Sequence, residues 1–225
     1  EISEPQPGED LVLTLDAVLQ HIAEEELARI VEERRAQNGS IVLLDPRSGA
    51  VLAMASWPGF DPNHFAASSP ESWRNRVVMD AYEPGSTFKM VTAAAALDGG
   101  LVSPDDLFDC EMGGITLAKT RISDHKPFGL LTFRDVIAKS SNVGTIKTAL
   151  RVPNGPFYET VRAFGFGRTT GIDLPGESAG LLLPVERWGP TTKAYVSFGQ
   201  GISVTPLQLA TAFALTFGLS APVVA

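Results

Sequence analysis

Two residues of the sequence, Ser86 and Lys89, have the side-chain types and the spacing needed for nucleophilic catalysis. A serine hydroxyl is a weak nucleophile until a base takes its proton. Residues three apart share one face of a helix, so the amine of Lys89 can reach the oxygen of Ser86. Lys89 can act as a base only if burial or a neighbouring cation lowers its pKa. Phe88, Met90 and the alanine run 93–96 favour such burial.

The local sequence places Ser86 at the start of a helix. Residues 83–85, Glu-Pro-Gly, exclude a helix before that point, and Gly99-Gly100 ends the helix predicted over residues 86–97. At such a position the Ser86 oxygen and its own backbone N–H lie where unpaired amides and the helix dipole favour negative charge. This predicts one half of an oxyanion hole.

A second polar element, Ser140-Ser141-Asn142, interrupts another predicted helix. That helix begins at Thr132 as N-cap, runs to residue 139 and resumes over 143–150. The element offers a hydroxyl and an amide, which are suited to relaying a proton and holding a peptide carbonyl. Taken singly, each motif has a simpler explanation: a serine cap followed by a solvated lysine, and a polar kink.

The remaining elements form a mixed pattern of helix and strand. Apolar residues at helical spacing predict a helix over 16–37, and Asn38-Gly39 ends it. Strands are predicted over 40–44 and 50–56 around a turn at 45–49, and residues 57–82 are expected to be mostly loop. Further helices are predicted over 157–164 and from Thr205-Pro206 to Phe217.

Composition limits the class of protein. The 225 residues, 44% of them hydrophobic, suit one domain, and a net charge of −8 provides no basic face for nucleic acid. We find no apolar run of about 20 residues, as a membrane span requires.

The single cysteine, Cys110, excludes an internal disulfide and, without Cys or His partners, a zinc site. We expect Cys110 to be a buried structural thiol rather than a nucleophile paired with His125, and we expect no metal or cofactor.

In this order and about fifty residues apart, the two motifs resemble the active-site serine families of β-lactamases and penicillin-binding proteins. The chain is most similar to the class B penicillin-binding proteins, monofunctional transpeptidases of septal and elongation-phase cell-wall synthesis. The resemblance covers nearly the whole chain. It extends to residues 11–16, 19–20, 42–46, 53–56, 61–63, 75–76, 82–89, 197–201 and 204–209.

This resemblance implies an α+β fold of the serine β-lactamase/D,D-peptidase type, mainly helical here, with the first two strands of the central antiparallel sheet. Residues 1–10 are expected to be a linker and 11–225 a partial penicillin-binding transpeptidase domain. The implied site consists of Ser86, which is acylated, Lys89 as base, Ser140 as proton relay, and Asn142, Gly199 and Gly201 on the substrate side. Ordinary helix capping explains the glycine turn equally well.

The implied function is a peptidoglycan D,D-transpeptidase that works through an acyl-serine and is inhibited by covalent penicillin binding. Its partners would be a stem peptide ending in D-Ala-D-Ala, β-lactam antibiotics and, for the parent protein, a membrane glycosyltransferase. The parent would lie in the bacterial cell envelope, at the extracytoplasmic face of the cytoplasmic membrane.

One element of the family is missing from the sequence. A Lys-Thr-Gly strand normally supplies the substrate carboxylate site and the second oxyanion N–H, and residues 119–121 and 147–149 approach it without the glycine. We therefore expect weak or no activity from this chain, and an exposed edge where two strands of about five remain.

Two alternatives stay open. A β-lactamase or β-lactam sensor shares the nucleophile and lysine. A class A enzyme needs a glutamate with asparagine four residues later, and only Glu71 and Asn75 have that spacing, upstream of Ser86. A noncatalytic binding or assembly module would also explain the missing element.

Overall fold

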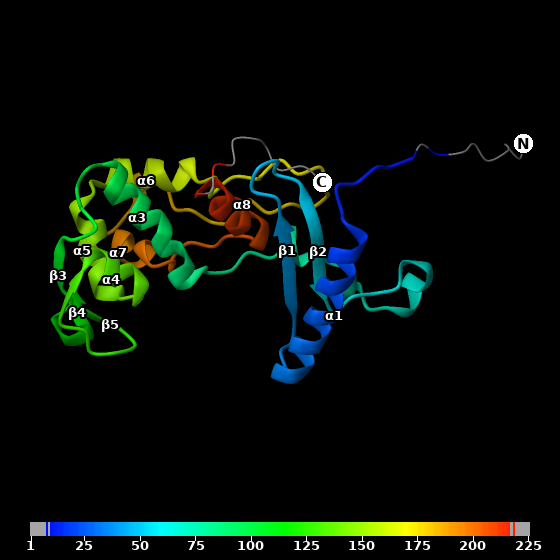
Figure 1. Cartoon of the computed structure of the whole chain (residues 1–225), viewed down its shortest axis with the longest axis horizontal. Coiled ribbons are helices and arrows are strands. Elements are labelled where there is room, and N and C mark those ends of the chain that lie inside the picture. The colour runs from blue at the N-terminus through cyan, green and yellow to red at the C-terminus, as the bar shows by residue number, and fades with distance from the viewer. Residues whose placement is uncertain (1–7, 9, 217, 219–225) are drawn as a thin grey trace, which may run out of the picture.

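The computed structural model describes residues 8, 10–216 and 218. Most of the predicted linker over residues 1–10 therefore lies outside the described residues, as does Phe217, the predicted end of the last helix. Figure 1 shows a hairpin of two long strands with one helix beside it at one end of the molecule and a group of helices at the other.

The hairpin consists of β1 (Gly39–Leu44) and β2 (Val51–Trp57), which pair antiparallel from Gly39↔Trp57 to Leu43↔Ala53, with an irregularity between Leu43 and Leu44. Both strands were predicted. Alternate residues of β2 are buried, which indicates that one face of the strand is covered more deeply than the other.

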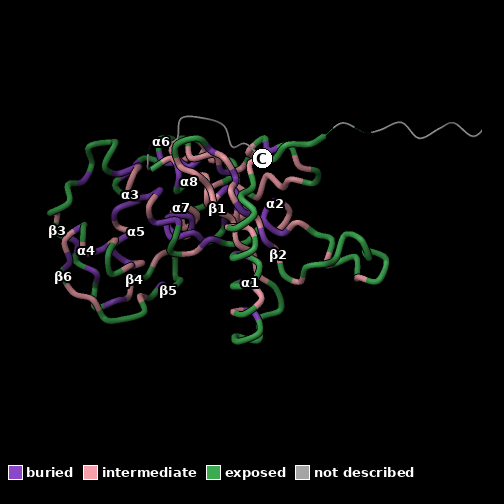
Figure 2. Tube along the Cα trace, turned by 45° about the vertical axis from the view of Figure 1, so that its right-hand side comes forward, coloured by how far each residue is buried: buried purple, intermediate pink, exposed green. Residues whose placement is uncertain are grey.

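Helix α1 (Ala17–Arg34) covers one face of the hairpin and follows the predicted range closely. The Asp16 carboxylate accepts hydrogen bonds from the amides of Val18 and Leu19, which caps its first turn. Figure 2 shows its outer side exposed. Its inner side packs on β2 through Ala23, Leu27, Val31, Ala53 and Ala55.

The opposite face of the hairpin packs on α2 (Arg76–Met79) and α8 (Pro206–Thr216). The predicted helix after Thr205-Pro206 is α8, and α2 is a short helix within the predicted loop 57–82. These elements share a small apolar core made of Val51, Val77, Val78, Ile172 and Leu207.

The helical group surrounds α5 (Asn142–Arg151), which packs against α3 (Lys89–Asp98), α4 (Phe133–Ala138) and α7 (Thr192–Ser197). The helix α6 (Asn154–Ala163) lies on α3. The largest core of the molecule fills this group. Its fully buried large side chains include Phe88, Ile146, Phe157, Phe166 and Ile202.

Two small pairs of strands close the far side of the helical group. They are β3 (Leu107–Asp109) with β6 (Leu130–Thr132), and β4 (Gly114–Leu117) with β5 (Thr120–Ser123), all antiparallel. These strands were not predicted from the sequence, because strands of three or four residues are too short for a period of two to stand out. The helix α7 was also missed.

Short 3₁₀ turns fill much of the connecting chain. Four of them are η1 (Pro62–Ala67), η2 (Pro70–Trp73), η4 (Glu111–Gly113) and η5 (Val185–Arg187). The fifth, η3 (Gly85–Phe88), corrects a prediction: the helix expected to begin at Ser86 starts as this tighter turn and becomes α-helical at Lys89. Within the described part of the chain, no helix is long and apolar enough to cross a membrane.

Candidate active site

Lys89 and Ser140 are in direct contact. The Nζ of Lys89, at the first position of α3, donates to the backbone oxygen of Ser140 at 2.6 Å and to its hydroxyl at 2.8 Å. Lys89 is only 2% exposed. Ser140 lies between α4 and α5 with a left-handed backbone, φ 57°. The fold therefore joins the two motifs that the sequence analysis selected.

The environment of Lys89 lowers the pKa of its amine. Burial disfavours the charged ammonium and lowers the pKa of Lys89 to about 8, although the negative charge of Asp124 acts in the opposite direction. An amine with this pKa has a substantial neutral fraction slightly above neutral pH, whereas an ordinary lysine has almost none. A neutral amine can accept a proton from a hydroxyl.

Ser86 lies in η3, one turn before Lys89, and its side chain is exposed. Phe88 anchors this turn, since it is fully buried and its ring is 5.2 Å from that of Phe166. Thr87 donates its hydroxyl to the Pro84 oxygen at 2.7 Å and so closes the turn. Ser86 is thus held on a fixed turn, with its oxygen open to an incoming molecule.

The predicted glycine turn packs directly against the segment that carries Ser86. The Gly85 amide donates to the Gly199 oxygen at 3.0 Å, and the Gly201 amide donates to the Glu83 carboxylate at 2.7 Å. A Cβ on Gly199 would lie 2.1 Å from the Gly85 oxygen, and Gly199 has φ 80°. The turn also ends α7, because the Gly199 amide bonds to the Val196 oxygen. Helix capping and support of the nucleophile segment are both present.

Asn142 is the first residue of α5. Its side-chain nitrogen donates to the Ser123 backbone oxygen at 2.9 Å, and it is half-buried. Ser141 caps the helix by accepting a hydrogen bond from the Gly144 amide at 2.9 Å. Asn142 therefore lies two residues beyond the Lys89–Ser140 contact, with its side-chain nitrogen turned to Ser123.

Asp124 is a residue of this site that the sequence analysis missed. Its carboxylate accepts hydrogen bonds from the Ser141 hydroxyl at 2.7 Å, from the Val143 amide at 3.0 Å and from the Asn142 amide. It follows β5 and belongs to no recognisable motif. Only the folded chain shows that it lies at the start of α5.

Cys110 and His125 do not form a catalytic pair. Cys110 is fully buried next to Gly144, where an added Cβ would lie 3.2 Å from the sulfur, and burial raises the pKa of its thiol. The ring of His125 packs on Phe128 with the residue exposed. The prediction of a structural thiol is confirmed. Across the described ranges, no three His, Cys, Asp or Glu side chains lie close enough to hold a metal ion.

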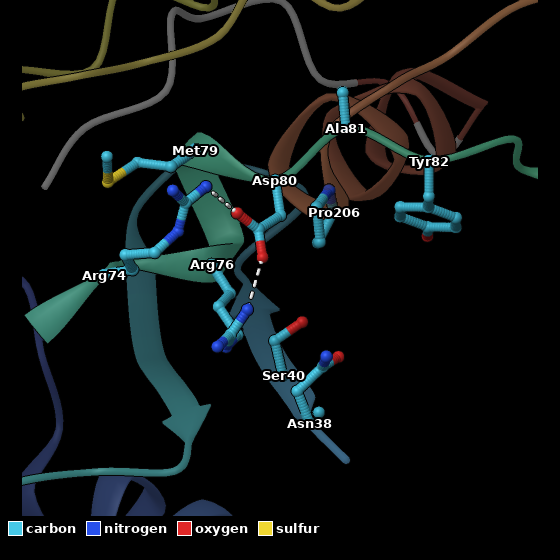
Figure 3. A pocket seen from close by; sticks show the side chains of 10 residues that line it. Asn38, Ser40, Arg74, Arg76, Met79, Asp80, Ala81, Tyr82 and Pro206 are labelled. Carbon is cyan, nitrogen blue, oxygen red and sulfur yellow. Dashed lines mark hydrogen bonds and ion pairs between the residues drawn. The ribbon is translucent and has the colours of Figure 1, made fainter. Parts of the chain in front are cut away.

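The structure also has a hollow of about 580 Å³ beside the start of β1, and it lies apart from Lys89 and Ser140. Figure 3 shows two arginines and Asp80 within it. Arg76 is 7% exposed and donates to Asp80 at 2.7 Å and to Glu71 at 2.8 Å. These charges neutralise one another and fix the segment that leads to Ser86, so we assign them a structural role.

The family model of the penicillin-binding protein transpeptidase domain matches residues 39–217. The chain belongs to this family. Stage V sporulation protein D of Bacillus subtilis is 38% identical over 207 residues, which are 91% of this chain and 32% of that protein. Peptidoglycan D,D-transpeptidase FtsI of Escherichia coli is 37% identical over 222 residues, 98% of this chain and 37% of that protein. The chain spans about a third of the length of these relatives.

Solved structures of penicillin-binding proteins share the fold. The transpeptidase domain of penicillin-binding protein 3 from Burkholderia pseudomallei has a TM-score of 0.85 and 32% identity, covering 97% of this chain and 62% of that one. Penicillin-binding protein 3 from Mycobacterium tuberculosis, complexed with aztreonam, has a TM-score of 0.84 and 37% identity, covering 90% and 46%. The predicted family and the serine β-lactamase/D,D-peptidase fold are confirmed.

Proposed function

We propose that this penicillin-binding transpeptidase domain carries the acyl-serine site of a peptidoglycan D,D-transpeptidase. The observation that supports it best is the buried amine of Lys89 on the hydroxyl of Ser140, one helical turn from Ser86. The name of the FtsI relative, a peptidoglycan D,D-transpeptidase, agrees with this chemistry.

In the proposed reaction, Ser86 attacks the carbonyl of the penultimate D-Ala of a stem peptide ending in D-Ala-D-Ala. Neutral Lys89 takes the hydroxyl proton, the Ser86 oxygen bonds to the carbonyl carbon, and the Ser86 backbone N–H stabilises the oxyanion. The amide bond to the last D-Ala then breaks, and Ser140 relays the proton to the leaving amine. Free D-Ala departs and leaves an acyl-serine.

The second half of the reaction forms the cross-link. An amino group of another stem peptide attacks the acyl carbon, loses its proton to the Lys89 amine through Ser140, and forms a new amide. The Ser86–carbon bond breaks, and the serine oxygen regains its proton. A β-lactam enters at the first step, but its broken amide nitrogen stays tethered to the acyl group, so the adduct persists.

On the substrate side, we assign Asn142 to a peptide carbonyl or amide of the stem peptide, because it lies at the start of α5, two residues beyond Ser140. We place Gly199 and Gly201 on the same side of the site, because Gly199 lets the backbone of Gly85 approach and Gly201 donates to Glu83 on the segment that carries Ser86. The parent protein would act at the extracytoplasmic face of the cytoplasmic membrane of a bacterium, with a membrane glycosyltransferase that supplies the glycan strands.

Covalent labelling tests the proposal. The folded chain is incubated with a fluorescent penicillin, and intact-mass and peptide-mapping mass spectrometry locate the adduct. We expect one penicillin per chain on Ser86, none on Ser86→Ala and normal labelling of the matched control Ser69→Ala, whose serine is exposed and lies outside the site.

Two outcomes contradict the proposal. Release of the penicilloyl group within seconds indicates a hydrolase of the β-lactamase type. The absence of any adduct on a chain shown to be folded by circular dichroism indicates a noncatalytic module.

A further inference from the structure

Asp124 and the residue before it hold the segment that follows Ser140. One oxygen of the Asp124 carboxylate accepts a hydrogen bond from the Ser141 hydroxyl. The other oxygen accepts hydrogen bonds from the Asn142 and Val143 amides. The Ser123 backbone oxygen accepts the Asn142 side-chain nitrogen at 2.9 Å. Amides in the first turn of a helix have no partner within the helix, and here a carboxylate from a distant segment supplies it.

This arrangement determines where the Ser140 hydroxyl lies. On the α4 side, the Ser140 amide bonds to the Ile137 oxygen at 3.1 Å and the Ser141 amide to the Val136 oxygen at 2.9 Å. Ser140 itself has φ 57°, a left-handed conformation that is unfavourable for a non-glycine residue. Such a residue keeps its backbone only when contacts on both sides enforce it. Asp124 provides the contacts on the α5 side.

Asp124 also acts on Lys89 through its charge. Its negative charge raises the pKa of Lys89 and offsets part of the effect of burial. Other titratable groups nearby are engaged elsewhere or neutral: Lys147 is bound to Glu111 at 2.6 Å, and the buried Cys110 has a raised pKa. His125 packs outward on Phe128, as described above.

We propose that Asp124 is a positioning residue of the acyl-serine site. Its carboxylate fixes the 140–143 segment and thereby the Ser140 hydroxyl, which accepts a hydrogen bond from the Lys89 ammonium. The effect on catalysis rests on the proposed function. The effect on the segment does not. Asp124 contacts neither Ser86 nor the reacting atoms in this arrangement, and it acts through Ser141, Asn142 and Val143.

Acylation by a fluorescent penicillin between pH 6 and pH 10 tests the effect on catalysis. Asp124→Ala removes the acceptor, and we expect its limiting rate to fall roughly 10–100-fold, as for a reacting group displaced by about 1 Å. Asp124→Asn removes the charge but keeps an acceptor. The acylation rate of this variant should rise with pH around a lower midpoint than in the unaltered chain, because the charge that raises the pKa of Lys89 is gone. Asp124→Glu should restore part of the rate and the original midpoint.

The matched control is Asp98→Asn, which removes the same charge from an exposed carboxylate at the far end of α3. We expect its rate and midpoint to stay unchanged. A purely structural role of Asp124 would lower the rate of Asp124→Asn and leave the midpoint where it was. An unchanged rate in Asp124→Ala together with an unchanged midpoint in Asp124→Asn would overturn the proposal.

Amide hydrogen exchange of the unaltered chain provides a test that needs no variant and no penicillin. The Asn142 and Val143 amides should exchange at least tenfold more slowly than those of Asn154 and Gly155, which begin α6 behind Pro153 without a side-chain cap. Equal exchange rates in the two pairs of amides would overturn the proposal that Asp124 clamps the start of α5. Protected amides on a folded chain that takes up no penicillin would support the clamp and contradict the proposed function, so the two failures are distinguishable.

Discussion

The ammonium of Lys89 donates to two acceptors of one residue, the backbone oxygen of Ser140 at 2.6 Å and its hydroxyl at 2.8 Å. Because Lys89 is almost fully buried, these acceptors replace the water that would surround the amine in solution. The two contacts have different consequences. The backbone oxygen can only hold the amine in place, whereas the hydroxyl can also pass a proton.

Removing the Ser140 hydroxyl should therefore affect acylation more than folding. We expect Ser140→Ala and Ser140→Gly both to be acylated by penicillin about 10²-fold more slowly, at the lower end of the range for a lost proton-transfer group. Ser140→Gly should be the more stable of the two by about 1 kcal/mol, because φ 57° suits glycine. Stopped-flow acylation and urea unfolding measure the two effects. Acylation of Ser140→Gly at the original rate would exclude a proton relay through this residue.

Burial of Lys89 also predicts how stability depends on pH. The pKa of Lys89 is about 8 in the folded chain and has its ordinary value of 10.5 when unfolded. Between these pH values the unfolded chain binds one more proton, so the free energy of unfolding rises with pH. Below pH 8 both states are protonated and the buried charge lowers stability, by about 3 kcal/mol at most.

Comparison with Lys89→Met isolates this effect from other groups that titrate in the same range. The variant has no amine, so the stability of the unaltered chain relative to Lys89→Met should increase from pH 8 to about pH 10.5 and be constant below pH 7. Urea unfolding of both chains at pH 6, 7, 8, 9 and 10 measures it. A difference that does not change with pH would show that the Lys89 amine titrates normally.

The local sequence predicted the parts of the site that depend on neighbouring residues. Ser86 lies on a turn because Pro84 and Gly85 precede it, and α4 breaks at Ser140 and resumes as α5 because polar caps stand there. Periodicity and capping act over a few residues, so a sequence records them directly. The pairing of β1 with β2 followed for the same reason, from two strands around a turn at Asp45.

The parts that the sequence did not reveal depend on contacts between distant residues. Asp124 looks like any surface carboxylate until the fold brings it to the start of α5. The approach of Gly199 to Gly85 is likewise invisible, since a glycine that ends a helix and one that leaves room for another backbone look the same in a sequence. The start of α3 shifted to Lys89 because Gly85, at φ 59°, begins a tighter turn.

The contact between Gly199 and Gly85 predicts a large difference between two glycine substitutions. Gly199→Ala places a Cβ 2.1 Å from the Gly85 oxygen and should destabilise the chain by roughly 3 kcal/mol or more, because backbone must move. Gly165→Ala has a similar φ, 90°, with nothing within 4 Å, and should cost only about 1–2 kcal/mol. Thermal and urea unfolding compare them. Similar costs would mean that the turn of Gly199 can move away from the segment of Ser86.

Two neighbouring arginines that share Asp80 should also differ in how much stability the chain loses when each is replaced. Arg76 is 7% exposed and bonds to Asp80 and Glu71, whereas the side chain of Arg74 is 42% exposed and bonds to Asp80 alone. Arg76→Ala removes buried packing and leaves two carboxylates without their inner partner. We expect a loss of about 3 kcal/mol, the lower end for a broken buried pair, because both carboxylates stay partly solvated.

Arg74→Ala removes the same charge at the surface and should cost no more than about 1 kcal/mol. Salt distinguishes the two variants further. At about 1 M salt the screening length falls to about 3 Å, so an exposed ion pair is weakened much more than a buried one. Urea unfolding in low and high salt should therefore reduce the effect of Arg74→Ala and leave that of Arg76→Ala nearly unchanged. Equal, salt-sensitive losses in both variants would show that Arg76 is solvated, and that the segment leading to Ser86 is anchored by its apolar residues instead.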